Sequence, residues 1–284
     1  MMEPFNLYLM DMSHADNTSG VDRYMHTLLK GLETYAHIRV YWIHLRHDMT
    51  VLFHEERTEF YTKITIPLPQ QFHEIISQKF WINKYNEQVY RIIRHLFEEK
   101  ENCIIHIHTL NLIDLAVYIK IRISCKIITH LHCIPWKDLY NSNKNKFNEL
   151  FNLQLTKEKS LTKNRNKFLT NNSEFQSYSD ADLIICVTNC AKDFLQNTMS
   201  IPEWKIKVIP NGINDFNCNN SDSIKNDNEI FKMLYVGVLS ESKGLNYILK
   251  AMRIVQRKGY ALSLTIAGKV HPFQAVDIKK KNRD

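Results

Sequence analysis

The sequence lacks long apolar runs, closely spaced cysteine pairs and a leader-like start. No apolar run reaches the ~18–20 residues that a membrane-spanning helix requires. None of the six cysteines forms a Cys-x-x-Cys pair, and four of them lie in or beside apolar runs, as buried free thiols do. The first residues have no basic segment and carry Glu3 and Asp11, unlike a signal peptide. We therefore expect a cytoplasmic protein in a reducing compartment, whose contact with a membrane would be peripheral, at the inner face.

A Gly-x-Gly-x-x-Gly fingerprint is absent as well, which disfavours a bound dinucleotide cofactor. The net charge of +7 is compatible with an anionic partner such as a phosphate, a nucleic acid or a membrane surface. No nucleic-acid recognition motif accompanies this charge, so we expect no nucleic-acid partner. The hydrophobic fraction of 44% is ample for a packed core.

Short apolar runs alternate with amphipathic stretches along most of the chain. The pattern predicts strands at residues 5–12, 38–45, 63–69, 103–109, 126–133, 181–188, 206–210, 231–237 and 262–268. It predicts helices at residues 21–32, 70–98, 111–122, from about 190, and at 245–258. The first and last of these show an apolar stripe on one face, formed by Val21, Tyr24, Met25, Leu28, Leu29 and Leu32 and by Leu245, Ile248, Leu249, Met252 and Val255. Residues 141–170 carry seven Lys/Arg against two Glu and are interpreted as a helical, solvated excursion. Such repeated β-α-β units predict an α/β fold with parallel sheets covered by helices on both faces.

The chain divides at a stretch rich in Asn, Asp and Ser, residues 215–229, which has the composition of a linker. Residues 1–214 before it hold enough units for a complete lobe. Residues 230–284 after it hold about one β-α-β unit, which is too small to bury both faces of a sheet. We expect this second lobe to be incomplete.

Ligands of open parallel sheets bind at the carboxyl ends of the strands. The residues that follow predicted strands there and attract interest are Gly20, His108, His132, Asn211, Gly212 and Gly237. Gly20 precedes a helix, where free N–H groups and a missing side chain suit an anion or the close approach of a substrate. Lys243 and Gly244 stand just before the helix at 245–258, where a lysine can meet a diphosphate together with the positive end of the helix. An ordinary loop glycine and a solvated surface lysine are the competing interpretations.

Two of the predicted strands each contain a His-x-His pair, His106/His108 and His130/His132. Residues two apart in a strand share a face. In mid-strand, His106 and His130 are expected to pack in the core or against a helix. His108 and His132 close their strands and are better placed for contact with solvent or ligand. A zinc site that also uses Cys133 is an alternative, which we disfavour because the tight ligand spacing is missing and the pairs lie on separate strands.

Five segments of the chain, in order, resemble glycosyltransferases of family 4, which have the GT-B fold. TSGVDRYMHTLLKGL (18–32) is similar to the glycine loop and first helix of the acceptor lobe. ADLIICVTNCAKDFL (181–195) and VIPNGIN (208–214) are similar to the segments that lead out of that lobe. LYVGVLSESKGLNYILKAM (234–252) and LTIAG (264–268) resemble the start of the donor lobe. The resemblance implies a Rossmann-like acceptor lobe followed by the start of a second Rossmann-like lobe.

The resemblance implies retaining transfer of a sugar from a nucleotide-diphosphate sugar to an acceptor hydroxyl, normally without a metal or cofactor. Gly20, Gly237, Lys243 and Gly244 would lie at the donor and its diphosphate, with Lys243 binding the diphosphate itself. His132 matches the strand-end histidine beside the transferred sugar and is the candidate catalytic residue. His108, Asn211 and Gly212 would shape the cleft between the lobes. A glycan or lipid-linked acceptor in polysaccharide synthesis is the expected partner, because HLHCIPW (130–136) suggests that branch.

Two departures from the family pattern put the activity in doubt. Val238 stands where the family usually has an arginine after the glycine of the first donor-lobe strand. The chain ends at Asp284, 16 residues after Gly268, and we find no counterpart of the family's later Glu-x7-Glu segment. We therefore expect a truncated donor lobe whose activity is lost or weak. A non-catalytic lobe that binds an acceptor or partner, and a GT-B sugar-nucleotide epimerase, are the alternatives.

Overall fold

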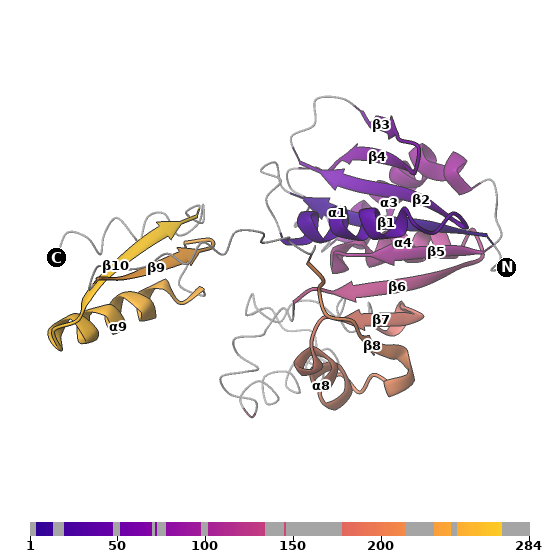
Figure 1. Ribbon diagram of the computed structural model, residues 1–284. Helices are drawn as coiled ribbons and strands as arrows, with labels where there is room; N and C mark the ends of the chain where they lie inside the picture. Colours follow the sequence, from indigo (N-terminus) through magenta and orange to yellow (C-terminus); the bar gives the residue numbers. More distant parts are fainter. Residues whose placement is uncertain are drawn as a thin grey trace. The chain divides into compact units, whose positions relative to one another are not determined.

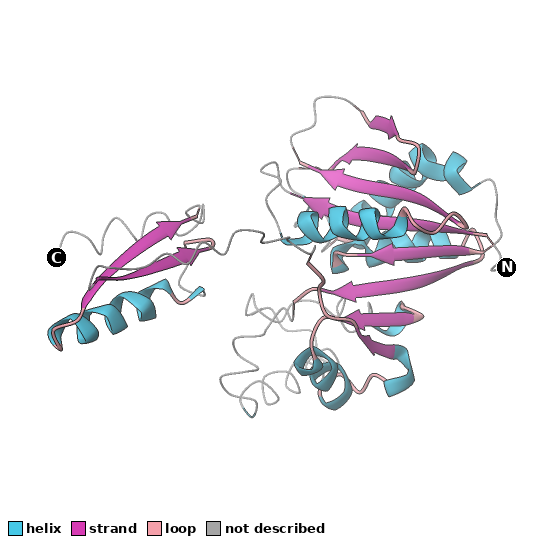
Figure 2. Cartoon of the chain, in the orientation of Figure 1, coloured by secondary structure: helices cyan, strands magenta, loops and turns pink. Residues whose placement is uncertain are grey.

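The computed structural model describes residues 4–13, 20–47, 52–69, 72, 78–97, 102–133, 145, 178–213, 230–239 and 243–268. It divides into two compact units, Met1–Asp215 and Phe216–Asp284 (Figure 1). Both units combine strands with helices (Figure 2). The basic stretch 141–170 lies outside the described residues apart from Asn145.

The first unit is built on one eight-stranded sheet in the order β3-β4-β2-β1-β5-β6-β7-β8. Its strands are β1 (Phe5–Ser13), β2 (Ile38–Arg46), β3 (His54–Arg57), β4 (Tyr61–Pro67), β5 (Cys103–Ile107), β6 (Cys125–Leu131), β7 (Leu183–Cys186) and β8 (Ile206–Val208). All neighbouring strands are parallel except β3, which runs antiparallel to β4. The predicted α/β architecture with parallel pairing is therefore confirmed.

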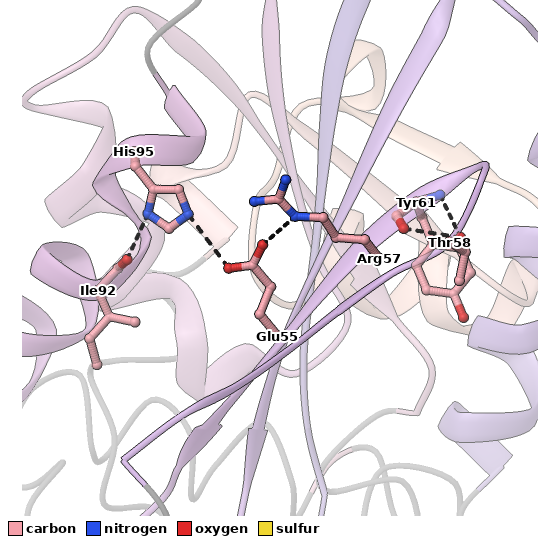
Figure 3. A network of polar contacts seen from close by, with 6 residues as sticks. All are labelled: Glu55, Arg57, Thr58, Tyr61, Ile92 and His95. Carbon is pink, nitrogen blue, oxygen red and sulfur yellow. Dashed lines mark hydrogen bonds and ion pairs between the residues drawn. The ribbon is translucent and has the colours of Figure 1, made fainter.

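Edge strand β3 was not predicted, because its sequence His-Glu-Glu-Arg has neither an apolar run nor an alternating pattern. Hydrogen bonds hold it in place (Figure 3). Thr58 Oγ1 accepts from the N–H of Tyr61 at 2.9 Å and closes the turn into β4. Arg57 Nε donates to Glu55 Oε1 at 2.6 Å, and His95 lies 4.0 Å from the other carboxylate oxygen of Glu55. A charged edge strand of this kind also discourages pairing with other chains.

Helices cover both faces of the sheet. Those of the first unit are α1 (Gly20–Leu32), α3 (Lys79–Ile93), α4 (Ile113–Lys120) and α8 (Asn189–Asn197), with short 3-10 turns η1 (Arg94–Phe97), η2 (Leu110–Leu112) and η3 (Glu203–Lys205). Helix α1 packs Met25 and Leu29 on one face, against side chains of β1 and β2. Helices α3, α4 and α8 contribute to the larger core on the opposite face. In Figure 1, α1 is drawn in front of β1.

The second unit is one β-α-β turn, made of β9 (Ile230–Val236), α9 (Leu245–Arg257) and β10 (Ala261–Ala267). Strands β9 and β10 pair in parallel. Of the predicted helical stripe, Leu245, Ile248, Met252 and Val255 are half-buried, whereas Leu249 is exposed. No residue of α9 is fully buried, and Phe231, Leu234 and Val236 of β9 are exposed. Among the described residues of this unit, Tyr235 alone is buried.

Two predicted boundaries need correction. Strands β5 and β6 end at Ile107 and Leu131, so His108 and His132 each stand one residue beyond their strand.

No helix in the described part of the chain is both long enough and apolar enough to cross a membrane.

Candidate functional site

The sheet face beneath α1 changes from apolar to polar along the strands. Its amino-terminal half carries the apolar side chains Leu7, Leu9, Val40, Trp42 and Ile104, which pack with α1. The residues that follow on the same face, two by two along each strand, are Asp11, Ser13, His44, His106, His108, His130 and His132. Polar side chains therefore gather at the carboxyl ends of β1, β2, β5 and β6, where open parallel sheets bind ligands.

The four histidines of β5 and β6 form one cluster, which we call the histidine cluster (His106, His108, His130 and His132). Strands β5 and β6 are hydrogen-bonded neighbours, so the two His-x-His pairs lie side by side. Ring nitrogens approach across the strands: His108 Nδ1 lies 3.1 Å from His132 Nε2, and His130 Nδ1 lies 3.3 Å from His106 Nε2. The rings of His130 and His132 are stacked with centroids 4.3 Å apart. The two pairs were expected to be apart because they lie on separate strands, but the pairing of β5 with β6 brings them together.

Burial keeps the histidine cluster uncharged. It lowers the pKa of His106 and of His130 to about 3, and that of His132 to about 4. The pKa of His108 is also well below its usual value, first because of burial and then because of the neighbouring histidines. All four imidazoles are therefore neutral near pH 7 and each carries one N–H and one lone pair. The burial expected for His106 and His130 is confirmed. For His108 we expected contact with solvent or ligand; only 4% of it is exposed, so contact with solvent is wrong and contact with a ligand stays a prediction.

Tyr24 of α1 lies against the histidine cluster. Its ring makes edge contacts with His130 and His132, each with centroids 4.8 Å apart. Its hydroxyl lies 3.4 Å from His130 Nδ1. The helix thereby restricts the two histidine rings of β6, and His132, which is half-buried, is the member of the cluster with the most access to solvent.

A second polar group, the Asp11 network, links Asp11, Trp42, His44 and Ser13 at the ends of β1 and β2. Trp42 Nε1 and His44 Nδ1 both donate to Asp11 Oδ1, at 2.7 and 2.8 Å. His44 Nε2 lies 3.1 Å from Ser13 Oγ. A carboxylate, an imidazole and a hydroxyl in this order resemble a catalytic triad. Ser13 is only 6% exposed, however, so its hydroxyl is not accessible to a substrate. The network is better suited to hold the end of the sheet rigid beside the histidine cluster.

Sequence reasoning missed Tyr24, Asp11, Ser13 and His44 as members of this region. Tyr24 was assigned to the apolar stripe of α1, and nothing in that stripe tells which aromatic reaches a neighbouring strand. The available signal was Asp11 itself, a carboxylate inside an otherwise apolar strand. A buried carboxylate requires donors, and the donors here, Trp42 and His44, come from the next strand, where His44 lies in register opposite Asp11.

The other predicted residues of the first unit lie at exposed positions. Gly20 is the first residue of α1, and a Cβ added there would meet no atom within 4 Å. Asn211 and Gly212 follow β8 and are exposed. The described part of this unit therefore gives none of these three residues a structural reason to be what it is.

In the second unit, Gly237 follows β9, and Lys243 and Gly244 precede α9, with Lys243 exposed. Gly244 is the N-cap of α9 and has φ of 78°, in the left-handed region that favours glycine, so the turn alone accounts for it. Val238 is 41% exposed. The described residues here, 230–239 and 243–268, contain six Lys or Arg and no Asp or Glu. Glu241 lies between these two ranges, so residues 230–268 as a whole carry six basic residues against one acidic residue.

Comparison with known proteins gives a family match. The family model described as Glycosyltransferase Family 4 matches residues 18–215, more than half of the 284-residue chain. None of the curated proteins matches the chain.

Solved structures resemble the fold at low sequence identity. Sucrose-phosphate synthase from Thermosynechococcus elongatus has a TM-score of 0.64 and 13% identity, over 98% of this chain and 66% of that chain. An E. coli trehalose-6-phosphate protein bound with UDP-2-fluoro glucose has a TM-score of 0.62 and 13% identity, over 98% of this chain and 68% of that chain. The catalytic domain of starch synthase IV from Arabidopsis thaliana, bound to ADP and acarbose, has a TM-score of 0.60 and 12% identity, over 99% and 72%. The fold is thus that of GT-B glycosyltransferases, and the chain spans about two thirds of the length of these structures.

Proposed function

Because the chain belongs to glycosyltransferase family 4, we propose that it is a retaining glycosyltransferase that uses a nucleotide-diphosphate sugar. Its acceptor is a glycan or a lipid-linked glycan in polysaccharide synthesis, and it works in the cytoplasm at the inner face of the membrane. The basic stretch 141–170 suits an anionic lipid surface. The nucleotide sugar is supported by the structural neighbours, of which one is bound with UDP-2-fluoro glucose and another with ADP.

The observation that carries this proposal is the polar half of the sheet face beneath α1. Polar groups here converge at the carboxyl ends of four strands, while the rest of the same face is apolar. In this proposal His132 contacts the transferred sugar. Its neutral imidazole lies 3.1 Å from His108 and is stacked on His130, so it would offer a sugar hydroxyl a hydrogen-bonding group of fixed orientation.

Gly20 supports the proposal because it has no side chain. Nothing in the described chain fills the space that a side chain at Gly20 would occupy. A glycine at the start of α1 leaves backbone N–H groups open to an anionic substrate. Exposed Asn211 and Gly212 would shape the chain beyond β8 rather than take part in the chemistry.

Lys243 is the proposed partner of the donor diphosphate, beside Gly237 and Gly244. Its ammonium group is exposed near the first turn of α9, and the sequence places one carboxylate, Glu241, two residues before it. Positive groups and helix N-termini stabilise the charge that develops on a leaving diphosphate. Val238 supplies no second charge, so we expect slow turnover.

Calorimetric titration of UDP, GDP and sugar nucleotides into the purified chain, followed by assays of donor hydrolysis, tests the proposal. We expect binding of one nucleotide class, and a loss of roughly 10- to 100-fold in affinity in Lys243→Ala, since a charge-assisted contact contributes about 1.5–3 kcal/mol. Lys258→Ala removes another lysine from the same unit and should leave the affinity unchanged. His132→Ala should abolish donor hydrolysis with little effect on nucleotide binding. The surface variant His95→Ala should leave both hydrolysis and binding unchanged.

The outcomes separate the proposal from its competitors. Binding without any turnover of the wild-type chain would favour a non-catalytic binding lobe. Equal affinities of Lys243→Ala and Lys258→Ala would remove Lys243 from the donor site. Absence of binding to every nucleotide would contradict the proposed function as a whole.

A further inference from the structure

Three members of the histidine cluster bring one ring nitrogen each close together. His106, His108 and His130 are buried, and one ring nitrogen from each lies within 4.8 Å of those of the other two. Two of them come from β5 and one from β6, so the arrangement depends on the backbone pairing of two central strands. Rigid placement on neighbouring strands is the kind of support that a metal site needs.

Two nitrogens of these imidazoles are buried without a partner. Nε2 of His108 and Nε2 of His130 have no hydrogen-bond partner within the part of the chain that the structure describes. A buried polar atom left unsatisfied costs about 1–3 kcal/mol. One tautomer satisfies the contacts that do exist: Nδ1–H of His108 donates to His132 Nε2, and Nδ1–H of His130 donates to His106 Nε2. In that tautomer both unpartnered Nε2 atoms carry lone pairs, whereas the Nε2 lone pair of His106 accepts from His130, so His106 would bind an ion only once that hydrogen bond is released.

From this geometry we propose that His106, His108 and His130 form a binding site for one divalent transition-metal ion of the zinc class. Imidazole nitrogen is a preferred ligand of Zn²⁺, Co²⁺, Ni²⁺ and Cu²⁺, whereas Mg²⁺ and Ca²⁺ require oxygen ligands. Zn–N bonds of about 2.0–2.1 Å place tetrahedral ligand atoms about 3.4 Å apart, so the three ring nitrogens, now within 4.8 Å of one another, would move closer together around an ion. Three protein ligands leave the fourth position of the ion open.

The surroundings of the three ligands match what surrounds metal-bound histidines. Such a histidine usually donates its second ring N–H to a neighbouring group, which fixes its tautomer. In the tautomer described above, His132 Nε2 accepts in this way from His108 Nδ1–H, at 3.1 Å. The ring of Tyr24 packs edge-on against His130 and limits its rotation. An ion bound to His108 would therefore also fix which ring nitrogen of His132 carries the proton. An effect of this on sugar binding rests on the proposed function, whereas the metal site itself does not.

Metal binding by the wild-type chain is the first experiment. The chain, freed of any affinity tag and stripped with a chelator, is dialysed against Zn²⁺ or Co²⁺ alone, and bound metal is counted. We expect about one ion per chain, with an X-ray absorption spectrum of about three imidazole ligands and no sulfur. Absence of binding would overturn the proposal, and so would sulfur in the coordination shell, because Cys133 and Cys190 are exposed thiols.

Variants then locate the ion. His108→Ala and His130→Ala should each weaken Zn²⁺ binding by more than about 100-fold, since a lost ligand costs more than the roughly 10–100-fold loss from a supporting residue. His95→Ala removes an exposed histidine of η1 as a matched control and should bind as the wild type does (Figure 3). Unchanged affinity in the two cluster variants would overturn the proposal.

Two further points keep the test decisive. Should either cluster variant fail to fold by circular dichroism, the ligand count of the wild-type ion decides alone. Nucleotide titration of the metal-free chain is read separately, so a failure of the transferase proposal and a failure of the metal site remain distinguishable.

Discussion

The two units of the chain share the same β-α-β sequence pattern but differ in how completely their described residues are buried. In the first, eight strands are covered on both faces, and α1, α4 and α8 each bury residues completely. In the second, two strands and one helix share the same parallel pairing, yet α9 buries no residue and Tyr235 is the one described core residue. The β-α-β pattern therefore specifies local structure in both, but a closed core requires layers on both faces.

Charge separates the two units as clearly as burial does. The first unit pairs its charges, as in Lys120 with Asp182 and Lys192 with Glu203. Counted over the whole sequence, residues 216–284 carry twelve Lys or Arg against six Asp or Glu, and residues 1–215 carry 25 against 24. The net positive charge of the chain therefore lies mainly in its second unit, which favours an anionic ligand there.

The largest expected contrast is in the effect of removing one aromatic side chain. Phe194→Ala in α8 removes a fully buried ring from the core of the first unit, and we expect a loss of about 3–5 kcal/mol in the free energy of unfolding. Tyr247→Ala in α9 removes a ring that is 72% exposed and should change stability by no more than about 0.5 kcal/mol. Urea denaturation of both variants measures this. Similar losses in the two would mean that Tyr247 is covered in solution.

Much of this architecture could be predicted from the sequence because period and burial are local properties. The stripe from Val21 to Leu32 predicted both α1 and its buried side, and the apolar run at 38–45 predicted β2. Strand β3 could not be found this way, since its charged residues become a strand only through pairing with β4.

The candidate site was only partly predictable because it depends on which strands become neighbours. The two His-x-His pairs were visible, but only the pairing of β5 with β6 makes them one cluster. Asp11 and His44 lie 33 residues apart and meet because β1 pairs with β2 in a register that places them opposite each other. No spacing rule within one strand carries that information.

Two helix-starting glycines give a contrast of middle size. Gly244→Ala forces a side chain into the left-handed region at φ of 78°, so α9 should lose about 1 kcal/mol of local stability. Gly20→Ala meets no neighbouring atom and should leave stability unchanged or slightly raised. Hydrogen exchange of the amides of α9 and α1 measures both effects. If Gly20 serves the substrate as proposed, its variant should lose donor turnover while it stays folded, and a fully active Gly20→Ala would contradict that role.

The smallest expected effect concerns an ion pair of the first unit, between Lys120 and Asp182. Partial burial acts to raise the pKa of Asp182, but hydrogen bonds from Lys120 Nζ at 2.6 Å and from the N–H of Ile127 at 2.8 Å, together with nearby lysine charges, hold it below 3.8. A carboxyl group whose pKa is lowered by folding stabilises the folded state above its ordinary value and loses that contribution as the pH falls through the lowered value. Asp182→Asn should therefore cost about 0.5–1 kcal/mol at pH 7, because the pair is partly exposed, and this difference from the wild type should vanish in acid. Urea denaturation between pH 7 and the acid range measures it, with the exposed variant Glu203→Gln as control. A difference that persists in acid would mean that Asp182 stabilises the junction of α4 and β6 by shape rather than by charge.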